Sequence, residues 1–319
     1  MKWSHACAFG APLALLGAIA VLGQDIPRRG SERPHAGGLY PRLPGAVVKA
    51  LDGIGTDAPF DVARFFAAVP GDRNAAPLYL DAFFEVGSDV AVCFPEGPER
   101  DRRSRAAEDR MRRYLELERA LRHDPQGVPA EAIDAVIALY ETGFRKLAEA
   151  QRRDRCVFET PLGLEEILCH AQASRQVARI AMLRTRRAVD RGEYDAAIRD
   201  VEVVLRLVRD LRPRGNMLTQ LVAAAITRVV CFAMIEPIVA APRLRVEHCD
   251  RLLKGLLDHE ASSFDGSAEG LRAEYLFARI KLRELALKQP QGTPRAAPDD
   301  LARAVGDTND YYRTLLGLD

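Results

Sequence analysis

Glu166 and His170 are the residues whose types and spacing come closest to a chemical site. They are four positions apart, so on a helix they share one face, with Glu165 and Cys169 beside them. Carboxylate, imidazole and thiolate groups are the usual ligands of zinc. No second His or Cys pair at ligand spacing accompanies them, and a Glu–His pair at this separation is commonly a contact on a helix surface. We therefore interpret them as structural and predict no metal site.

The carboxylates Glu260, Glu269 and Glu274 lie near one another in the sequence. A glycosidase acting on cell-wall sugar needs an acidic residue of this kind in a cleft. Charged residues make up 29% of the chain, so a cluster like this is more often a solvated helix face. His248 lies beside an apolar stripe to which Cys249 belongs, and we interpret that pair as structural too.

Other catalytic signatures are missing from the sequence. It has no serine in a sharp glycine-flanked turn and no cysteine with a clear histidine partner motif. Its glycine-rich stretches lack the strand-to-helix setting of a phosphate-binding loop. The sequence therefore predicts neither a catalytic residue nor a cofactor.

Five cysteines follow Cys7 in the chain, and an odd number leaves at least one thiol free. Cys169, Cys231 and Cys249 fall within predicted helices, and we expect them to be buried free thiols. Cys93 and Cys156 fall at predicted helix ends, where two loops could meet. In an oxidising compartment these two could form a disulfide.

Arginine-rich residues 100–113 form the densest basic stretch, but acidic side chains are interleaved with them: Glu99, Asp101, Glu108 and Asp109. No aromatic ladder for stacking bases accompanies them. We expect a salt-bridged, exposed helix rather than an anion site. Over the whole chain, 46 Lys and Arg nearly balance 45 Asp and Glu, so no net field favours nucleic acid or anionic lipid.

Residues 1–23 have the form of a secretory signal peptide. A short positive start with Lys2 precedes an apolar run from Ala6 to Gly23, and small residues offer cleavage after Ala20 or Gly23. An uncleaved signal anchor is the alternative, and it would be the only membrane attachment we expect. The sequence thus predicts an exported protein of the periplasm or cell envelope.

The rest of the chain divides by composition into three parts. Residues 24–73 are rich in Pro, Gly and charge and are predicted to be a tether, partly ordered near its end. Residues 74–288 carry apolar residues three or four apart, the period of amphipathic helices. Residues 289–319 begin with Pro and Gly and are predicted to be a tail with a short helix.

No segment alternates apolar and polar residues for long enough to predict a strand, so the expected class is all-α. Short turns between helices predict antiparallel hairpins, as between residues 107–121 and 133–147. The architecture is then an irregular bundle or a stack of helical hairpins. Residues 216–235 are apolar all round, which predicts a buried helix; Arg228 and Glu236 argue against a membrane span.

The segment AVDRGEYDAAIRDVEVVLRL, residues 188–207, resembles the junction between the two helices of a tetratricopeptide repeat. Gly192 would end the first helix, Tyr194 would pack over the turn, and Ala197 would allow close helix approach. No second copy at the repeat period accompanies it. The resemblance implies one similar helical hairpin and no superhelix.

Three further segments resemble those of uncharacterised exported α-helical bacterial proteins: AAPLYLDAFFE (75–85), CFPEG (93–97) and EGLRAEY (269–275). This resemblance implies no activity and no site residue. The leading hypothesis is a non-catalytic exported helical scaffold that binds another envelope protein. The alternative is a cell-envelope hydrolase with carboxylates in a helical cleft, from among Glu166, Glu269 and Glu274.

Overall fold

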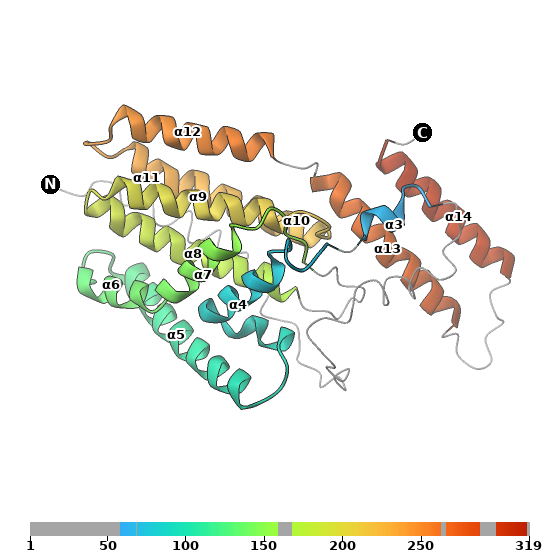
Figure 1. Cartoon of the computed structure of the whole chain (residues 1–319), viewed down its shortest axis with the longest axis horizontal. Helices are drawn as coiled ribbons and strands as arrows, with labels where there is room; N and C mark the ends of the chain where they lie inside the picture. Colours follow the sequence, from blue (N-terminus) through green and yellow to red (C-terminus); the bar gives the residue numbers. More distant parts are fainter. Residues whose placement is uncertain (1–57, 68, 159–167, 263–265, 288–297, 318–319) are drawn as a thin grey trace.

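The computed structural model describes residues 58–67, 69–158, 168–262, 266–287 and 298–317, which form an all-α protein (Figure 1). Within these ranges there is no strand, and the only β pairing is an isolated parallel bridge between Asn74 and Arg155. The predicted all-α class is confirmed. The signal segment 1–23, most of the predicted tether, residues 288–297, and Glu165 and Glu166 lie outside the described residues.

The elements follow one another along the chain with mostly short connections. In order they are α3 (Val62–Phe65), α4 (Ala76–Val86), the 3-10 helix η1 (Ser88–Cys93), α5 (Pro98–His123), α6 (Ala130–Ala138), α7 (Glu141–Ala150), α8 (Cys169–Asp190), α9 (Tyr194–Leu211), α10 (Met217–Val229), the π-helix η2 (Val230–Ile235), α11 (Glu236–Val239), α12 (Val246–Ala261), α13 (Gly266–Leu287) and α14 (Pro298–Leu315).

Helix ends fall where the local chemistry places them. The Asn216 side chain accepts a hydrogen bond from the Thr219 N–H at 3.0 Å, so it caps α10. Pro77 lies in the first turn of α4, where a missing N–H costs nothing. Gly192 follows α8 with a φ of 74°, a left-handed conformation that favours glycine.

The main core lies where α4 and α7 meet the antiparallel pair α8 and α9. Helices α10 and α12 and segment η2 also pack against α9. The largest side chains fully enclosed in the molecule include Tyr79, Phe83, Phe84, Leu147, Ile180, Ile198, Leu207 and Leu211. Burying each such side chain stabilises the fold by roughly 1.5 to 3 kcal/mol before entropy is counted.

A second, smaller core joins the ends of the described chain. Val62 and Phe66 of α3 pack with Tyr275 and Leu276 of α13 and Tyr312 of α14. These helices lie together on the right of Figure 1. The last helix, α14, spans 18 residues and is therefore longer than the predicted short helix. Tyr312 packs α14 against Tyr275 of α13, a contact that composition could not reveal.

The predicted partner of α5 is divided into α6 and α7 at Leu139 and Tyr140. The Tyr140 ring is fully buried, and its hydroxyl donates to the Arg110 carbonyl of α5 at 3.0 Å. Beyond this break, α7 approaches α4 closely at Gly143, where a Cβ would come within 3.0 Å of Val86. Because of this break, α6 packs against α5 whereas α7 packs against α4.

The helix formed by α10, η2 and α11 is not buried on every side, which corrects the sequence prediction. Four large apolar side chains on it are exposed to solvent: Leu218, Leu221, Phe232 and Val239. By length and composition alone, Met217–Val239 could cross a membrane, and 39% of its most apolar window is buried inside the protein. A core helix of a soluble protein passes the same test.

Adjacent leucines in α12 provide a direct test of this packing. Leu252 is buried against the main core and Leu253 is 56% exposed. We expect Leu252→Ala to lower the free energy of unfolding by about 2 to 3 kcal/mol, because it leaves a cavity. Leu253→Ala should change it by no more than about 0.5 kcal/mol. Urea denaturation of both variants measures the difference, and equal losses would contradict the assigned orientation of α12.

Candidate functional site

The turn between α8 and α9 has the geometry expected of a helical hairpin. Ala197 is fully buried between the helices, and Tyr194 is nearly so. The Glu193 N–H donates to the Ala188 carbonyl at 2.8 Å and closes the turn beside Gly192. The assignment of this hairpin to the tetratricopeptide class stays a prediction.

His248 lies at this turn and has a structural role. Its ring meets Tyr194 edge-on with centroids 5.5 Å apart, and its Nδ1 accepts a hydrogen bond from the Arg245 N–H at 3.2 Å. It therefore helps to cap α12. An open hollow of about 480 Å³ beside it is lined by charges of both signs, including Asp195 and Arg199.

Two of the carboxylates that the alternative hydrolase hypothesis would place in a cleft, Glu269 and Glu274, bind backbone groups near the start of α10. Glu269 accepts a hydrogen bond from the Arg214 N–H at 3.0 Å, and Glu274 accepts one from the Met217 N–H at 3.3 Å. A negative charge is stabilising at a helix N-terminus. Glu260 is exposed on α12, away from this pair of interactions. Nothing brings these three side chains to one catalytic geometry.

The cysteines differ from the sequence predictions. Cys93 Sγ lies 2.6 Å from Cys169 Sγ, whereas the predicted partner Cys156 is buried in another environment. Cys169 is buried as expected, but Cys231 and Cys249 are exposed, so the prediction of buried thiols is wrong for these two. The prediction failed because Cys231 and Cys249 lie on the outer faces of the α10–α11 helix and of α12, which no other described helix covers.

Burial raises the pKa of the Cys156 thiol, and the nearby Asp210 carboxylate raises it further. Asp210 accepts hydrogen bonds from the Tyr79 hydroxyl at 2.8 Å and from Arg206 at 2.9 Å. These contacts tie α4 to α9 inside the core. Cys156 therefore stays a protonated thiol at neutral pH.

His170 is buried and stacks on Phe158, with centroids 4.6 Å apart and planes at 6°. It follows Cys169 at the start of α8. Glu165 and Glu166 lie outside the described residues. Within the described ranges, no group of three His, Cys, Asp or Glu side chains is placed to hold a metal ion.

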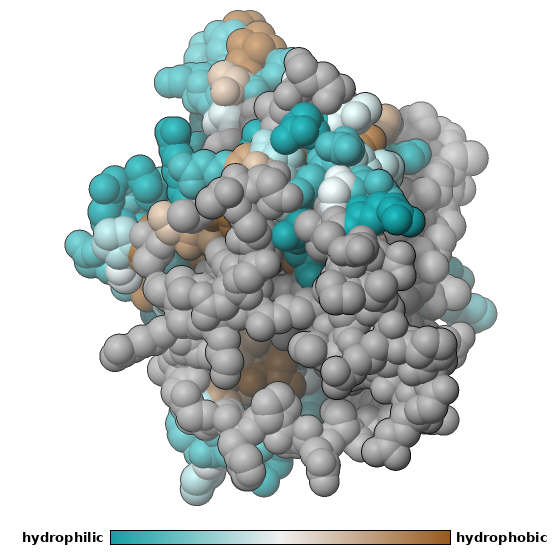
Figure 2. Space-filling model, turned by 90° about the vertical axis from the view of Figure 1, so that its right-hand side faces the viewer, coloured by the Kyte–Doolittle hydropathy of each residue, from teal (hydrophilic) through white to brown (hydrophobic). Residues whose placement is uncertain are grey.

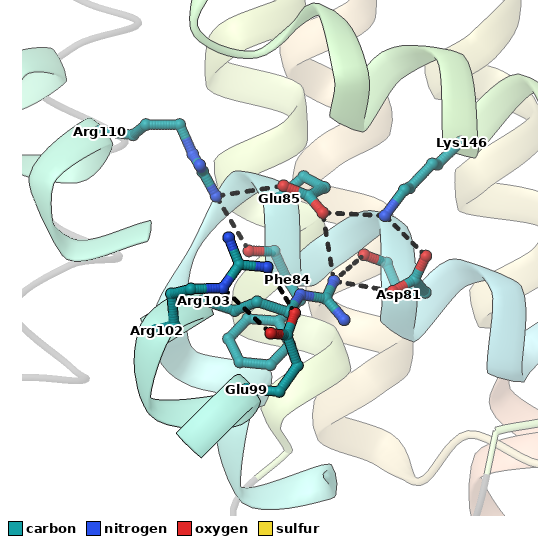
Figure 3. A network of polar contacts seen from close by, with 8 residues as sticks. All are labelled: Asp81, Phe84, Glu85, Glu99, Arg102, Arg103, Arg110 and Lys146. Carbon is teal, nitrogen blue, oxygen red and sulfur yellow. Dashed lines mark hydrogen bonds and ion pairs between the residues drawn. The ribbon is translucent and has the colours of Figure 1, made fainter. Parts of the chain in front are cut away.

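A network of charges joins α4, α5 and α7 (Figure 3). Glu85 of α4 is at its centre, with Lys146 at 2.8 Å, Arg103 at 3.2 Å and Arg110 at 3.5 Å. Asp81, one turn earlier, contacts Lys146 at 2.8 Å and Arg103 at 2.7 Å. Three cations therefore meet two carboxylates in a partly buried site.

The surroundings of this network explain its charge state. Burial by itself raises the pKa of Asp81, but hydrogen bonds from Lys146 and Arg103 outweigh burial and hold that pKa below its ordinary value. The Arg103 guanidinium also lies over the Phe84 ring, 4.4 Å from its centroid. A hollow of about 390 Å³ opens beside the network, with the exposed Arg102–Glu99 pair at its edge. With three cations against two carboxylates, the charges of the network nearly balance, and its arrangement favours a structural role.

The predicted salt-bridged helix is α5, and most of its arginines pair on the surface. Arg103 and Arg110 instead turn inward to Glu85, with side chains only 20% and 16% exposed. Sequence reasoning missed this because the carboxylates belong to α4. The spacing of Asp81 and Glu85, one helical turn apart, was the available signal.

The outward side of α12 carries an uncovered apolar surface. Val246 is 72% exposed, and Leu253 and Leu257 are each more than half exposed. Cys249 is exposed too. These positions are separated by three, four and four residues, so they form one stripe along the helix. We call these four residues the α12 apolar face.

The space-filling view shows the end of this outer helix (Figure 2). Helix α12 is the uppermost helix in Figure 1, and hydrophobic atoms are exposed beside hydrophilic ones at the top of Figure 2. The sequence gives the apolar spacing of α12 but not the side that is covered. Because Leu252 packs inward against the core, the neighbouring Leu253 and the residues one turn away face outward. The α12 apolar face is the candidate functional site.

Comparison of the sequence with protein-family models and with curated proteins, and of the structure with solved structures, finds no match.

The charge network predicts unequal roles for two carboxylates. Glu85→Ala removes the central acceptor of three cations, and we expect it to lower the free energy of unfolding by about 2 kcal/mol. Glu99→Ala removes an exposed surface pair, which solvent screens, and should leave the free energy of unfolding almost unchanged. Urea titrations at neutral pH compare them. A loss for Glu99→Ala equal to that for Glu85→Ala would contradict the structural role of the network.

Asp200 on α9 predicts a specific pH dependence. Burial raises its pKa to about 6, and the opposing effect of Arg184, whose Nε lies 3.2 Å from both carboxylate oxygens, is too small to reverse the shift. The folded state therefore binds a proton that the unfolded state has released, and this stabilising contribution is lost as the pH rises through about 6.

Relative to Asp200→Asn, the native protein should lose roughly 2 to 3 kcal/mol of unfolding free energy between pH 4 and pH 7. Denaturant titrations at several pH values measure this difference. Asp195→Asn, at an exposed position on the same helix, is the matched control. A difference between native and Asp200→Asn proteins that stays constant or grows with pH would show that the ion pair with Arg184 dominates.

Proposed function

We propose that the protein is a non-catalytic helical scaffold that binds another protein through the α12 apolar face. The observation that carries the proposal is the exposure of this continuous stripe on a helix whose opposite side is packed in the core. Helices of soluble proteins normally turn such a stripe inward. A helix-in-groove or helix-on-helix contact with a partner would cover it.

The charges beside the stripe point to a basic partner helix. The exposed charged side chains of α12 are Glu247, Asp250, Asp258 and Glu260 against the single base Lys254. An amphipathic helix with leucines on one face and lysines or arginines at its edges would match both the apolar face and this acidic border. The acidic border also disfavours an anionic membrane surface.

The position of α12 supports this assignment. It is an outer helix, packed mainly against α9, and it follows the partly uncovered helix α10–α11. In stacks of helical hairpins, a terminal pair normally has a polar outer face. Here the outer side of α12 remains apolar, as expected where another helix is added from outside the chain.

A cell-envelope hydrolase is the second candidate function, and it has less support. Two of the carboxylates on which it depends, Glu269 and Glu274, accept backbone hydrogen bonds near the start of α10. Those bonds give both side chains a capping role. The proposal that the partner is an envelope protein depends on the N-terminal signal segment, which lies outside the described residues.

Binding of a defined peptide tests the proposal. The probe is a fluorescent amphipathic helical peptide with leucines at helical spacing and lysines beside them, and the full chain is titrated against it. We expect saturable binding that weakens with salt, because the border charges contribute. The double variant Leu253→Glu and Leu257→Glu should weaken binding at least about tenfold, or about 1.4 kcal/mol. Fluorescence anisotropy measures it.

Two controls make the test specific to the face and to its charge. Val92→Glu changes an exposed apolar residue on η1 and should leave binding unaltered. A peptide of equal hydrophobicity with glutamates in place of lysines should bind more weakly. Unchanged binding to the double variant would overturn the proposed face. Self-association that the double variant abolishes would assign the face to a second copy of the chain. Adsorption to zwitterionic vesicles that the double variant abolishes would assign it to a membrane. Either result would overturn the proposed partner.

A further inference from the structure

Cys93 and Cys169 bring two sulfur atoms together from distant parts of the chain. The residues are 76 positions apart, and their Sγ atoms lie 2.6 Å from each other. Cys93 is the last residue of η1, and Cys169 is the first of α8. Both are thiols in the structure. A disulfide requires side chains already directed at each other, and this pair meets that requirement.

Aromatic contacts hold both sulfur-bearing segments in place. Phe94, next to Cys93, packs on Phe84 with centroids 4.8 Å apart. His170, next to Cys169, stacks on Phe158. Segment η1 and helix α8 also pack directly on each other. The approach of the two sulfurs is therefore fixed by the core and does not depend on a free loop.

The surroundings also favour reaction. The hydrogen bond from Cys93, with a smaller effect of the neighbouring His170, lowers the pKa of the Cys169 thiol to about 5 against the opposing effect of burial. A thiolate is the form that takes part in thiol–disulfide exchange. Cys93 is partly exposed and Cys169 is buried, so an external reagent reaches Cys93 first.

We propose that Cys93 and Cys169 form a disulfide bond when the protein meets a small-molecule or protein disulfide as oxidant. Cys93 loses its thiol proton as its sulfur attacks the oxidant disulfide, forming a mixed disulfide and releasing one thiolate of the oxidant, which takes up a proton. The Cys169 thiolate then attacks the Cys93 sulfur and displaces the second thiolate of the oxidant. The two cysteines lose two electrons and two protons, and the oxidant becomes two thiols.

The bond would close a loop that contains α5, α6 and α7. Because that loop is long, the cross-link removes much of the freedom of the unfolded chain and stabilises the folded one. It would also fix η1, and with it the end of α4, to the start of α8. This inference is independent of the α12 apolar face, so either can fail without the other.

Oxidation of the full chain tests the proposal. A parent carrying Cys231→Ser and Cys249→Ser removes the exposed competing thiols, and it is incubated with oxidised glutathione or left reduced. After denaturation and alkylation with N-ethylmaleimide, the oxidised sample should carry two fewer alkyl groups, and peptide mapping should find Cys93 linked to Cys169. The oxidised protein should unfold at a temperature roughly 10 °C higher than the same protein with dithiothreitol.

Two variants of the parent identify the pairing. Cys156→Ser should form the cross-link as the parent does, whereas Cys93→Ser should retain all its remaining thiols or carry glutathione. Circular dichroism checks that each variant is folded. A Cys93–Cys156 link would overturn the proposal. So would glutathione bound separately to Cys93 without a cross-link, or complete alkylation of both residues after oxidation.

Discussion

Burial of helix α9 is the constraint on which the rest of the main bundle depends. This helix packs with α8 on one side and with α10, η2 and α12 on others, and its apolar side chains are almost completely enclosed. A helix in the middle of so many neighbours leaves little freedom in their placement. The turn at Gly192 sets where α8 lies, and the cap at Asn216 sets where α10 begins. The position of α12 follows because α9 is its main support.

Charged side chains inside this bundle affect its stability in two different ways. Around Glu85, cations and carboxylates are nearly balanced and only partly buried, so each charge is stabilised by its neighbours. Asp200 has a close cation in Arg184, yet its burial has the larger effect. A close ion pair therefore does not by itself show a net gain in stability. The number of cations around a carboxylate and its access to water decide whether its charge stabilises or destabilises the folded protein.

The sequence was sufficient where local rules determine the structure. Apolar residues three or four apart predicted helices throughout residues 74–288, and Gly192 marked the end of α8 through local chemistry that needs no distant partner. The sequence was insufficient where contacts between distant segments determine the structure. The division of α6 from α7 depends on the Tyr140 hydroxyl reaching α5, and the neighbour of Cys93 depends on which segments the core brings together. Of the candidate site, the spacing of the stripe was predictable but its exposure was not, because periodicity does not say which side of a helix is covered.

The π-helical segment η2 gives the long helix of α10 and α11 a particular response to changes in length. A π turn holds one residue more than an α turn, and buried residues occur on both sides of η2, with Ile226 and Val229 before it and Ile238 after it. Loss of a single residue within η2 would let the segment close into an ordinary α turn while both flanks keep their inward faces. The same loss within α9 would rotate everything that follows by about 100° and turn its core residues to solvent. Loss of one residue should therefore be better tolerated within η2 than in the middle of α9.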